Sequence, residues 1–368
     1  MGHFKISGRL GDSAGVQEDG AMDDEALIWT DGPIGRIRLN RPRAINALTS
    51  AMIDIVRVAL DDFSADPAIA AIAIDGAGER GLCSGADVRA LRAEILERGA
   101  EAAAAFWRNE YAMNSQIAAL QKPYAAFMDG VVMGGGVGIS TYGSIRVTTP
   151  RTRLAMPETG IGLFPDVGTM FTLSRAPGEL GTHMALTGAP VPGGDAVRAG
   201  FADAVIEPDR WEDLLEALRN TPQDANAVDA ARDRERALGA AGADEQPVGA
   251  LAGSAWIAEC YASDDAAEII ERLTTHEDPE ARAAGELIAS RSPLSVAVTL
   301  AALRRAATLP DLDAVLAQDL RIAQKFTQDS DFLEGVRAVL VDKDNSPRWR
   351  HGHVREVESD LVASIISE

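Results

Sequence analysis

Two carboxylates lie close together in the run MPETGIGLFPDVG, residues 156–168, where Glu158 follows Pro157 and Asp166 follows Pro165. Proline fixes φ and lacks an amide donor, so each acid lies on a stiffened stretch of chain. The glycines between them permit a bend that could bring both acids to one site. Two neighbouring carboxylates cannot both ionise freely, so one pKa rises and general acid and general base roles separate.

The alternative interpretation is that both are solvated loop acids, as are most of the 56 acidic residues of this chain. The neighbours Met156, Ile161, Leu163 and Phe164 are apolar. A buried, idle charge would be costly among such side chains. A buried setting would therefore favour a functional role for the pair.

Two glycine-bearing segments, GLCSGADV (residues 81–88) and DGVVMGGGVG (residues 129–138), are expected beside a strand end or a helix start. Free amides at a helix N-terminus point toward developing negative charge. One amide from each segment would form an oxyanion hole for a carbonyl under attack. The alternative is that these glycines serve only tight turns or close helix packing.

Other chemistries fit the sequence poorly. The nearest approach to a serine-hydrolase elbow, Gly138–Tyr142, lacks the final glycine. A dinucleotide fingerprint that starts at Gly134 meets Ile139 where glycine or alanine is needed. The histidines lack metal-site spacing, so no metal is expected. Cys83 is interpreted as a packing residue rather than a nucleophile.

The composition narrows the classes of partner. The chain has 368 residues and a formal net charge of −21. This charge repels phosphates and anionic lipids, so we expect neither a nucleic acid nor a membrane partner. Only 2 cysteines occur, and we find no signal-peptide pattern, so a cytoplasmic location is predicted. An anionic substrate must then be bound by local donors.

Strand-like and helix-like segments alternate in the first half of the chain and predict an α/β core. Ile34–Leu39 and Ile69–Ile74 are predicted strands. Thr49 is the predicted N-cap of a helix with an apolar stripe at helical spacing. The division predicted is a loose tail over 1–24, the α/β core over 25–219, a mobile connecting segment over 220–250 and a helical region over 251–368.

Several motifs in this order, from about Leu39 to Trp349, resemble the crotonase superfamily, also called the enoyl-CoA hydratase/isomerase family. The matching runs are RPRAINAL, GLCSGADVRAL, FWRNEY, QKPYAAFMDGVVMGGGVGIS, MPETGIGLFPDVG, LTGAPVPGGDAVRAGFADAVI, SPLSVAVTL and DFLEGVRAVLVDKDNSPRW. The resemblance implies a crotonase-like α/β spiral of ββα units with a C-terminal helical lobe. FWRNEY, FPDVG and the tail resemble the branch that hydrolyses thioesters of short 3-hydroxyacyl-CoA.

The family forms its oxyanion hole from two backbone amides, which fall here on Ala86 and Gly135. The resemblance also implies that the loop of Ser84, Gly85, Ala86, Asp87 and Val88 lines the coenzyme A site. Glu110 in FWRNEY falls on a position that contacts the substrate, at its 3-hydroxyl group.

In the hydratase branch, the position three residues after the oxyanion glycine carries a glutamate, but here it is Gly138. Glu158 falls on the second hydratase acid, and Asp166 on an acid that the hydrolase branch uses. The resemblance thus implies that Glu158 activates water or attacks the thioester directly, two routes that the sequence leaves open. Asp166 would tune Glu158 and move a proton.

The activity implied is hydrolysis of 3-hydroxyisobutyryl-CoA, as in valine breakdown, or of a related short 3-hydroxyacyl-CoA. Coenzyme A is part of that substrate, so no separate cofactor is expected, and a homo-oligomer is possible because relatives are often trimers. Arg41 and Arg43 are candidates for binding the phosphates of coenzyme A, and the alternative is that both are solvated surface charges. Enoyl-CoA hydration and non-catalytic acyl-CoA binding are the alternative functions.

Overall fold

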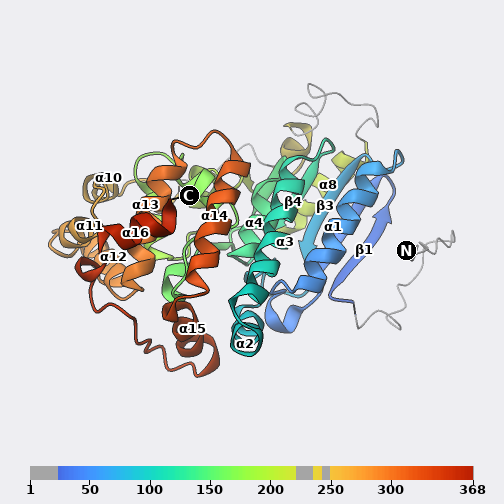
Figure 1. Ribbon diagram of the computed structural model, residues 1–368. Helices are drawn as coiled ribbons and strands as arrows, with labels where there is room; N and C mark the ends of the chain where they lie inside the picture. Colours follow the sequence, from blue (N-terminus) through green and yellow to red (C-terminus); the bar gives the residue numbers. More distant parts are fainter. Residues whose placement is uncertain (1–23, 221–234, 243–248, 368) are drawn as a thin grey trace.

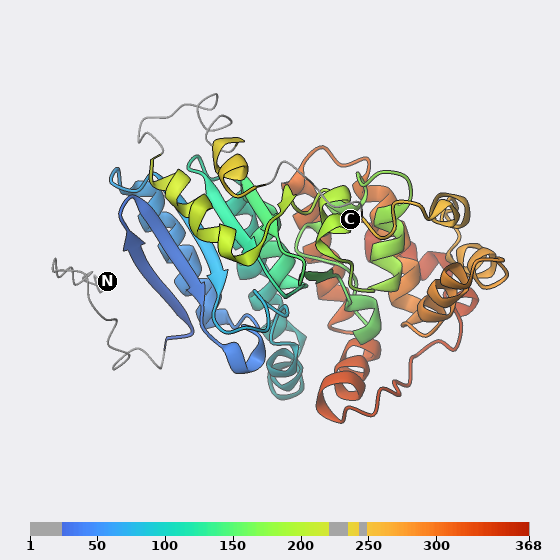
Figure 2. The same ribbon diagram turned by 180° about the vertical axis from the view of Figure 1, so that it is seen from behind.

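The structure is a computed structural model that describes residues 24–220, 235–242 and 249–367. The predicted tail over 1–24 and much of the predicted connecting segment lie outside these residues. Figures 1 and 2 show two halves side by side: a sheet with its covering helices, and a lobe built from helices.

A six-stranded sheet forms the first half, in the order β1-β2-β3-β4-β6-β8. β1 and β2 pair antiparallel, and every later pair in this sheet is parallel. A second sheet pairs β5 with β7 in parallel. The strands are β1 Ala26–Asp31, β2 Ile34–Leu39, β3 Ala71–Gly76, β4 Tyr124–Met128, β5 Val131–Met133, β6 Ile145–Thr148, β7 Arg153–Ala155 and β8 Ala204–Val205.

Helices cross between the parallel strands, as parallel pairing requires. Thr49 is the N-cap of α1, and its hydroxyl accepts from the Met52 amide, which confirms the predicted cap. The predicted strand over 69–74 begins two residues later, because Ile69 is still in the turn that leaves α1. The helices before β8 are η1 Pro42–Ala44, α1 Ser50–Ala65, α2 Val88–Arg98, α3 Ala100–Ala118, α4 Gly135–Thr141, η2 Glu158–Ile161, α5 Thr169–Leu173, α6 Leu180–Thr187 and α7 Gly193–Arg198. Of these, α5 and α6 pack against α13 (Pro293–Ala306) of the helical lobe.

α1 and α3 cover one face of the sheet. The other face is covered by η3 Pro208–Arg210, α8 Trp211–Arg219 and a further helical stretch at 235–240. The Trp211 ring stacks on Phe127 of β4 with ring centroids 4.8 Å apart. Ala237 and Ala241 are buried in the same cluster. The part of the predicted mobile connection that the structure describes is therefore packed and largely helical, because alanines here fit against α8 without needing a long apolar stripe.

The remaining helices form the lobe: α10 Ala255–Cys260, α11 Ala266–Thr274, α12 Pro279–Ala289, α13 Pro293–Ala306, α14 Leu312–Phe326, α15 Ser330–Val336, the π-helical η4 Arg337–Val341, η5 Val354–Glu356 and α16 Ser359–Ile366. One apolar core joins the lobe to the α1–α3 face of the sheet. α14 lies along α3, as Figure 1 shows, and α15 packs against η2. The lobe thus packs against η2, the short helix that begins at Glu158.

Within the described ranges, no single helix combines the length and apolar character needed to cross a membrane; α12 and α13 meet these criteria only together, across a 111° bend.

Candidate active site

Two backbone amides meet where the loop before α2 passes the N-terminus of α4. Leu48 donates to Gly85 O, and Asp87 donates back to Leu48 O, so the amide of Ala86 points away from this bridge. A Cβ added at Gly135 would lie 3.5 Å from Ala86 N. Among the residues that the structure describes, no group accepts a hydrogen bond from the Ala86 or Gly135 amide. Both predicted oxyanion amides are thus free and close together.

Three carboxyl groups are buried beside these amides. Glu158 begins η2, Asp166 lies in the loop after it, and Glu110 comes from α3; their exposed fractions are 6%, 5% and 1%. A Cβ at Gly134 would lie 2.9 Å from Glu158 Oε1, and one at Gly135 would overlap Glu110 Oε1. The glycines therefore leave room for the Glu158 and Glu110 carboxyl groups to approach the backbone. The burial of Glu158 and Asp166 excludes the interpretation of both as solvated loop acids.

Burial controls the protonation of these acids. Desolvation, together with the nearby charge of Asp166, raises the pKa of both Glu110 and Glu158 well above the usual range. Burial also raises the pKa of Asp166, to about 6, but the hydrogen bond from Tyr111 opposes this shift. The hydroxyl of Tyr111 donates to Asp166 Oδ2 at 2.6 Å. Asp166 is therefore the first of the three acids to ionise.

Two carboxyl oxygens in this group, Glu110 Oε1 and Glu158 Oε2, lack a hydrogen-bond partner among the described residues. Buried polar atoms are normally satisfied, and exceptions need an explanation. The water or substrate groups that reach this space would supply the missing partners.

The position of the absent hydratase acid is filled by other side chains. A Cβ at Gly138 would lie 2.8 Å from the Val167 Cβ and 3.0 Å from Asn114 Nδ2. Even alanine would be tight there, and a glutamate side chain has no space. Val167 and Asn114 therefore occupy the space that an acid at this position would need.

The other predicted contact residues form the loop that holds Ala86. Ser84 Oγ donates to Ala44 O at 3.1 Å, and Gly85 adopts φ +103°. Asp87 caps α2 by accepting from the Ala90 amide, and Val88 begins that helix. Whether coenzyme A lies against these residues stays a prediction.

Arg41 has protein partners in place of the predicted phosphates. Its guanidinium donates to Asp87 at 3.0 Å and to Ala47 O at 2.6 Å, and it pairs with Glu25 at 3.4 Å. Arg43 is exposed. Arg41 therefore ties the two loops together, which explains its position in the RPRAINAL motif without any ligand.

Tyr111, Asn114, Tyr142 and Asp319 belong to this site, although sequence reasoning did not select them. Asn114 lies four residues after Glu110 on α3, so helical spacing could have found it, whereas Tyr111 is the last residue of FWRNEY itself. No comparable sequence signal marks Asp319, which reaches the site from the distant helix α14. Cys83 is buried and burial raises its pKa to about 12, consistent with packing.

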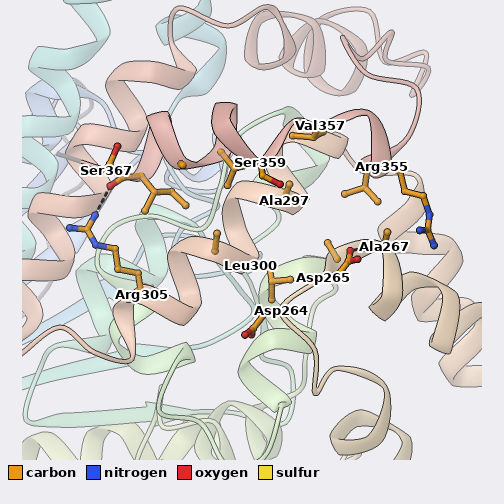
Figure 3. A pocket seen from close by; sticks show the side chains of 16 residues that line it. Asp264, Asp265, Ala267, Ala297, Leu300, Arg305, Arg355, Val357, Ser359 and Ser367 are labelled. Atoms are coloured by element: carbon orange, nitrogen blue, oxygen red, sulfur yellow. Dashed lines mark hydrogen bonds between the residues drawn. The ribbon is translucent and has the colours of Figure 1, made fainter.

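A hollow of about 1270 Å³ lies elsewhere, among α11, α13, η5 and α16 (Figure 3). Three of its polar side chains already have partners: Asp265 caps α11, Arg305 donates to Ile366 O, and Arg355 pairs with Glu271. None of the three buried carboxyl groups lines it. The chemistry is therefore concentrated at the α3, α4 and η2 junction.

Comparisons with known proteins agree with this geometry. The rat protein named 3-hydroxyisobutyryl-CoA hydrolase, mitochondrial, is 38% identical over 344 residues, covering 92% of this chain and 88% of the relative. The human protein of the same name is 37% identical over 350 residues, covering 92% and 87%.

Solved structures give a complementary result. A carnitinyl-CoA dehydratase from Mycobacterium thermoresistibile is 42% identical with a TM-score of 0.86, over 94% of this chain and 97% of that one. An enoyl-CoA hydratase from Rhodobacter sphaeroides 2.4.1 is 37% identical with a TM-score of 0.84, over 93% and 97%. The fold is the crotonase fold predicted from the motifs. The family model described as enoyl-CoA hydratase/isomerase matches residues 34–366, and the chain therefore belongs to this family.

Proposed function

We propose that this protein hydrolyses 3-hydroxyisobutyryl-CoA, or a closely related short 3-hydroxyacyl-CoA, to the free acid and coenzyme A. Curated relatives that match more than nine tenths of this chain carry the name of that hydrolase. The observation that carries the proposal is the packing at Gly138: Val167 and Asn114 occupy the space that a second hydratase acid would need. The buried carboxyl groups argue against a site that only binds acyl-CoA.

In this proposal the thioester carbonyl lies against the amides of Ala86 and Gly135. These donors stabilise the negative charge that develops on oxygen when the carbonyl is attacked. Loss of one such donor typically costs about 3–4 kcal/mol of transition-state stabilisation. Glu110, whose free Oε1 lies at Gly135, is available to bind the 3-hydroxyl group of the substrate.

Glu158 either activates water or attacks the carbonyl to give a mixed anhydride that water then cleaves. Either route needs an ionised Glu158, although its pKa is raised well above the usual range by burial. Asp166 ionises first and is near enough to influence Glu158 electrostatically. We therefore assign Asp166 the task of accepting the proton that Glu158 gives up before it acts as base or nucleophile. Carbon–sulfur cleavage releases the coenzyme A thiolate, which takes up this proton from Asp166.

The names of the similar solved structures favour a different reaction, hydration or dehydration of an acyl-CoA double bond. The two functions give different products from different substrates. With 3-hydroxyisobutyryl-CoA, a hydrolase releases free thiol, which a thiol reagent detects. With crotonyl-CoA, a hydratase removes the conjugated thioester absorbance without releasing thiol. Absence of thiol release together with loss of that absorbance would replace our proposal by the hydratase function.

The packing at position 138 predicts the outcome of restoring the missing acid. We expect Gly138→Glu to gain no hydration of crotonyl-CoA and to lower the free energy of unfolding by about 1–3 kcal/mol or more, because overpacking displaces Val167. Gly239→Ala is the control, since a Cβ at Gly239 meets nothing within 4 Å. A stable Gly138→Glu protein that hydrates crotonyl-CoA would contradict the argument from packing.

The hydrogen bond from Tyr111 to Asp166 predicts how kcat depends on pH. This hydrogen bond stabilises ionised Asp166, so Tyr111→Phe should raise the Asp166 pKa above about 6. If Asp166 must be ionised, the rise of kcat with pH moves to higher pH in the variant, while activity recovers at the alkaline end. kcat measured between about pH 5 and 9 tests this. Tyr124→Phe is the control, because it loses a buried hydrogen bond to Ile139 O instead; an equal shift there would exclude our explanation.

We further propose that the substrate is the only source of coenzyme A and that no separate cofactor is needed. The names of the curated relatives describe mitochondrial proteins, so a cytoplasmic location for this chain stays a prediction, as does a homo-oligomer.

A further inference from the structure

The turn Asp166–Gly168 is held in an unusual conformation. Val167 adopts φ +50° and Gly168 φ +79°, two left-handed residues in succession. Glycine adopts this region freely, but a β-branched residue there is a genuine outlier. Strain of this kind typically costs about 1–3 kcal/mol and persists only where the surroundings enforce it.

Groups from three helices enforce the turn. Tyr142, which follows α4, donates through its hydroxyl to Val167 O at 2.6 Å. Asn114 of α3 donates weakly to the same oxygen at 3.4 Å. Asp319 of α14 accepts from the Gly168 amide at 2.8 Å. Both sides of one peptide group, the one that joins Val167 to Gly168, are therefore held directly after Asp166.

Asp319 is an unusual residue to accept a hydrogen bond from the Gly168 amide. It is fully buried, and its Oδ1 has no hydrogen-bond partner among the described residues. Desolvation and the charge of Asp166 raise its pKa well above the usual range, which favours the neutral acid. A neutral carboxyl group still accepts from Gly168, so the hydrogen bond does not need a charge.

We infer that Asp319 is a positioning residue, which acts through the Gly168 amide to fix the left-handed Val167 and thereby the direction of the Asp166 carboxyl group toward Tyr111. Because α14 belongs to the helical lobe, the hydrogen bond between Gly168 and Asp319 also makes the position of Asp166 depend on that lobe. The inference rests on the proposed function for its kinetic tests, but its structural test needs no substrate.

Removal of the acceptor is the first test. In Asp319→Ala we expect kcat for thiol release to fall by about 10- to 100-fold while KM changes little, because a displacement of about 1 Å can reduce the rate by this much. Asp319→Asn should keep most of the activity, since its amide oxygen can accept from Gly168. An asparagine variant as impaired as the alanine variant would overturn the inference, since geometry alone would not explain the loss.

A matched control separates positioning from general destabilisation. Gln318, the neighbour of Asp319 on α14, is also buried, and its side chain donates to Ala302 O at 3.2 Å, toward α13. Gln318→Ala should lower the melting temperature without an equal loss of kcat. If it lowers kcat as much as Asp319→Ala does, the inference is wrong.

Two further measurements keep the test decisive. Tyr142→Phe removes the other strong hydrogen bond to the turn and should lower kcat in the same way, even if Asp319→Ala does not fold; unchanged kcat would count against the inference.

A crystal structure of a folded variant gives the substrate-free test. We expect the Tyr111–Asp166 hydrogen bond of 2.6 Å to be lost and Val167 to leave φ +50°. An unchanged turn overturns the inference, whereas a wild-type protein without thiol release overturns only the proposed function.

Discussion

The Glu158→Gln variant should release thiol from 3-hydroxyisobutyryl-CoA roughly 10²- to 10⁴-fold more slowly than the wild type, the range typical for removing a general base. If Glu158 is the attacking group, the loss will be greater, because an amide does not form the anhydride. Glutamine has nearly the same shape, and Glu158 Oε2 has no hydrogen bond to lose among the described residues. Substrate affinity should therefore survive.

Two measurements check this expectation: single-turnover thiol release and the dissociation constant of the intact substrate measured with the inactive variant. Glu259→Gln is the control, since its side chain is 70% exposed and belongs to α10 of the lobe. Near wild-type turnover of Glu158→Gln would remove Glu158 from the mechanism. Loss of binding together with turnover would instead assign Glu158 to substrate recognition.

The Asp166→Asn variant should be more stable than the wild type at neutral pH and much less active. Burial raises the pKa of Asp166 from 3.8 to about 6 in the folded protein. The folded state therefore holds its proton more tightly than the unfolded state does. The stability that this proton gives is fully present below pH 3.8 and is lost as pH rises toward about 6.

Asparagine is neutral at every pH, so it avoids this loss and still can accept from Tyr111. A pKa raised from 3.8 to about 6 corresponds to about 3 kcal/mol of unfolding free energy at pH 8, and the difference should vanish at about pH 3, below the unfolded-state pKa. Denaturant unfolding at both pH values measures it. Thiol release should fall by about 100-fold or more, because the proton acceptor is gone. Equal stability at pH 8, or full activity, would contradict the assignment of Asp166 as the ionised acid.

The order of the motifs was enough to identify the fold and to select Glu158, Asp166, Ala86 and Gly135, whose place in a catalytic site stays a prediction. Local rules explain this success. The Thr49 cap and the apolar stripe of α1 depend on spacing within one helix. The glycines of residues 134–136 open α4 at the end of a strand, so the free amide of Gly135 is a local consequence of the helix start. Glu158 and Asp166 are held by proline and glycine within one short run.

What the sequence could not decide depends on contacts between distant segments. The Gly168 amide and Asp319 are 151 positions apart, and an aspartate within an amphipathic helix carries no mark of its partner. The pairing of Arg41 with Asp87 likewise required the fold, since a sequence shows a charge but not its neighbour. The same holds for Ala237 and Ala241, whose burial comes from α8.

The sequence by itself predicted that Glu158 and Asp166 form an acid pair, and through the family resemblance it showed Gly138 where the hydratase branch has an acid. Only the tertiary structure decided how the pair works. Burial raises the pKa of both acids, the hydrogen bond from Tyr111 opposes this rise at Asp166, and Val167 closes the space beside Gly138. The physical reason is that burial and hydrogen bonding depend on which side chains pack around a residue. Here those side chains come from helices that are far apart in the chain.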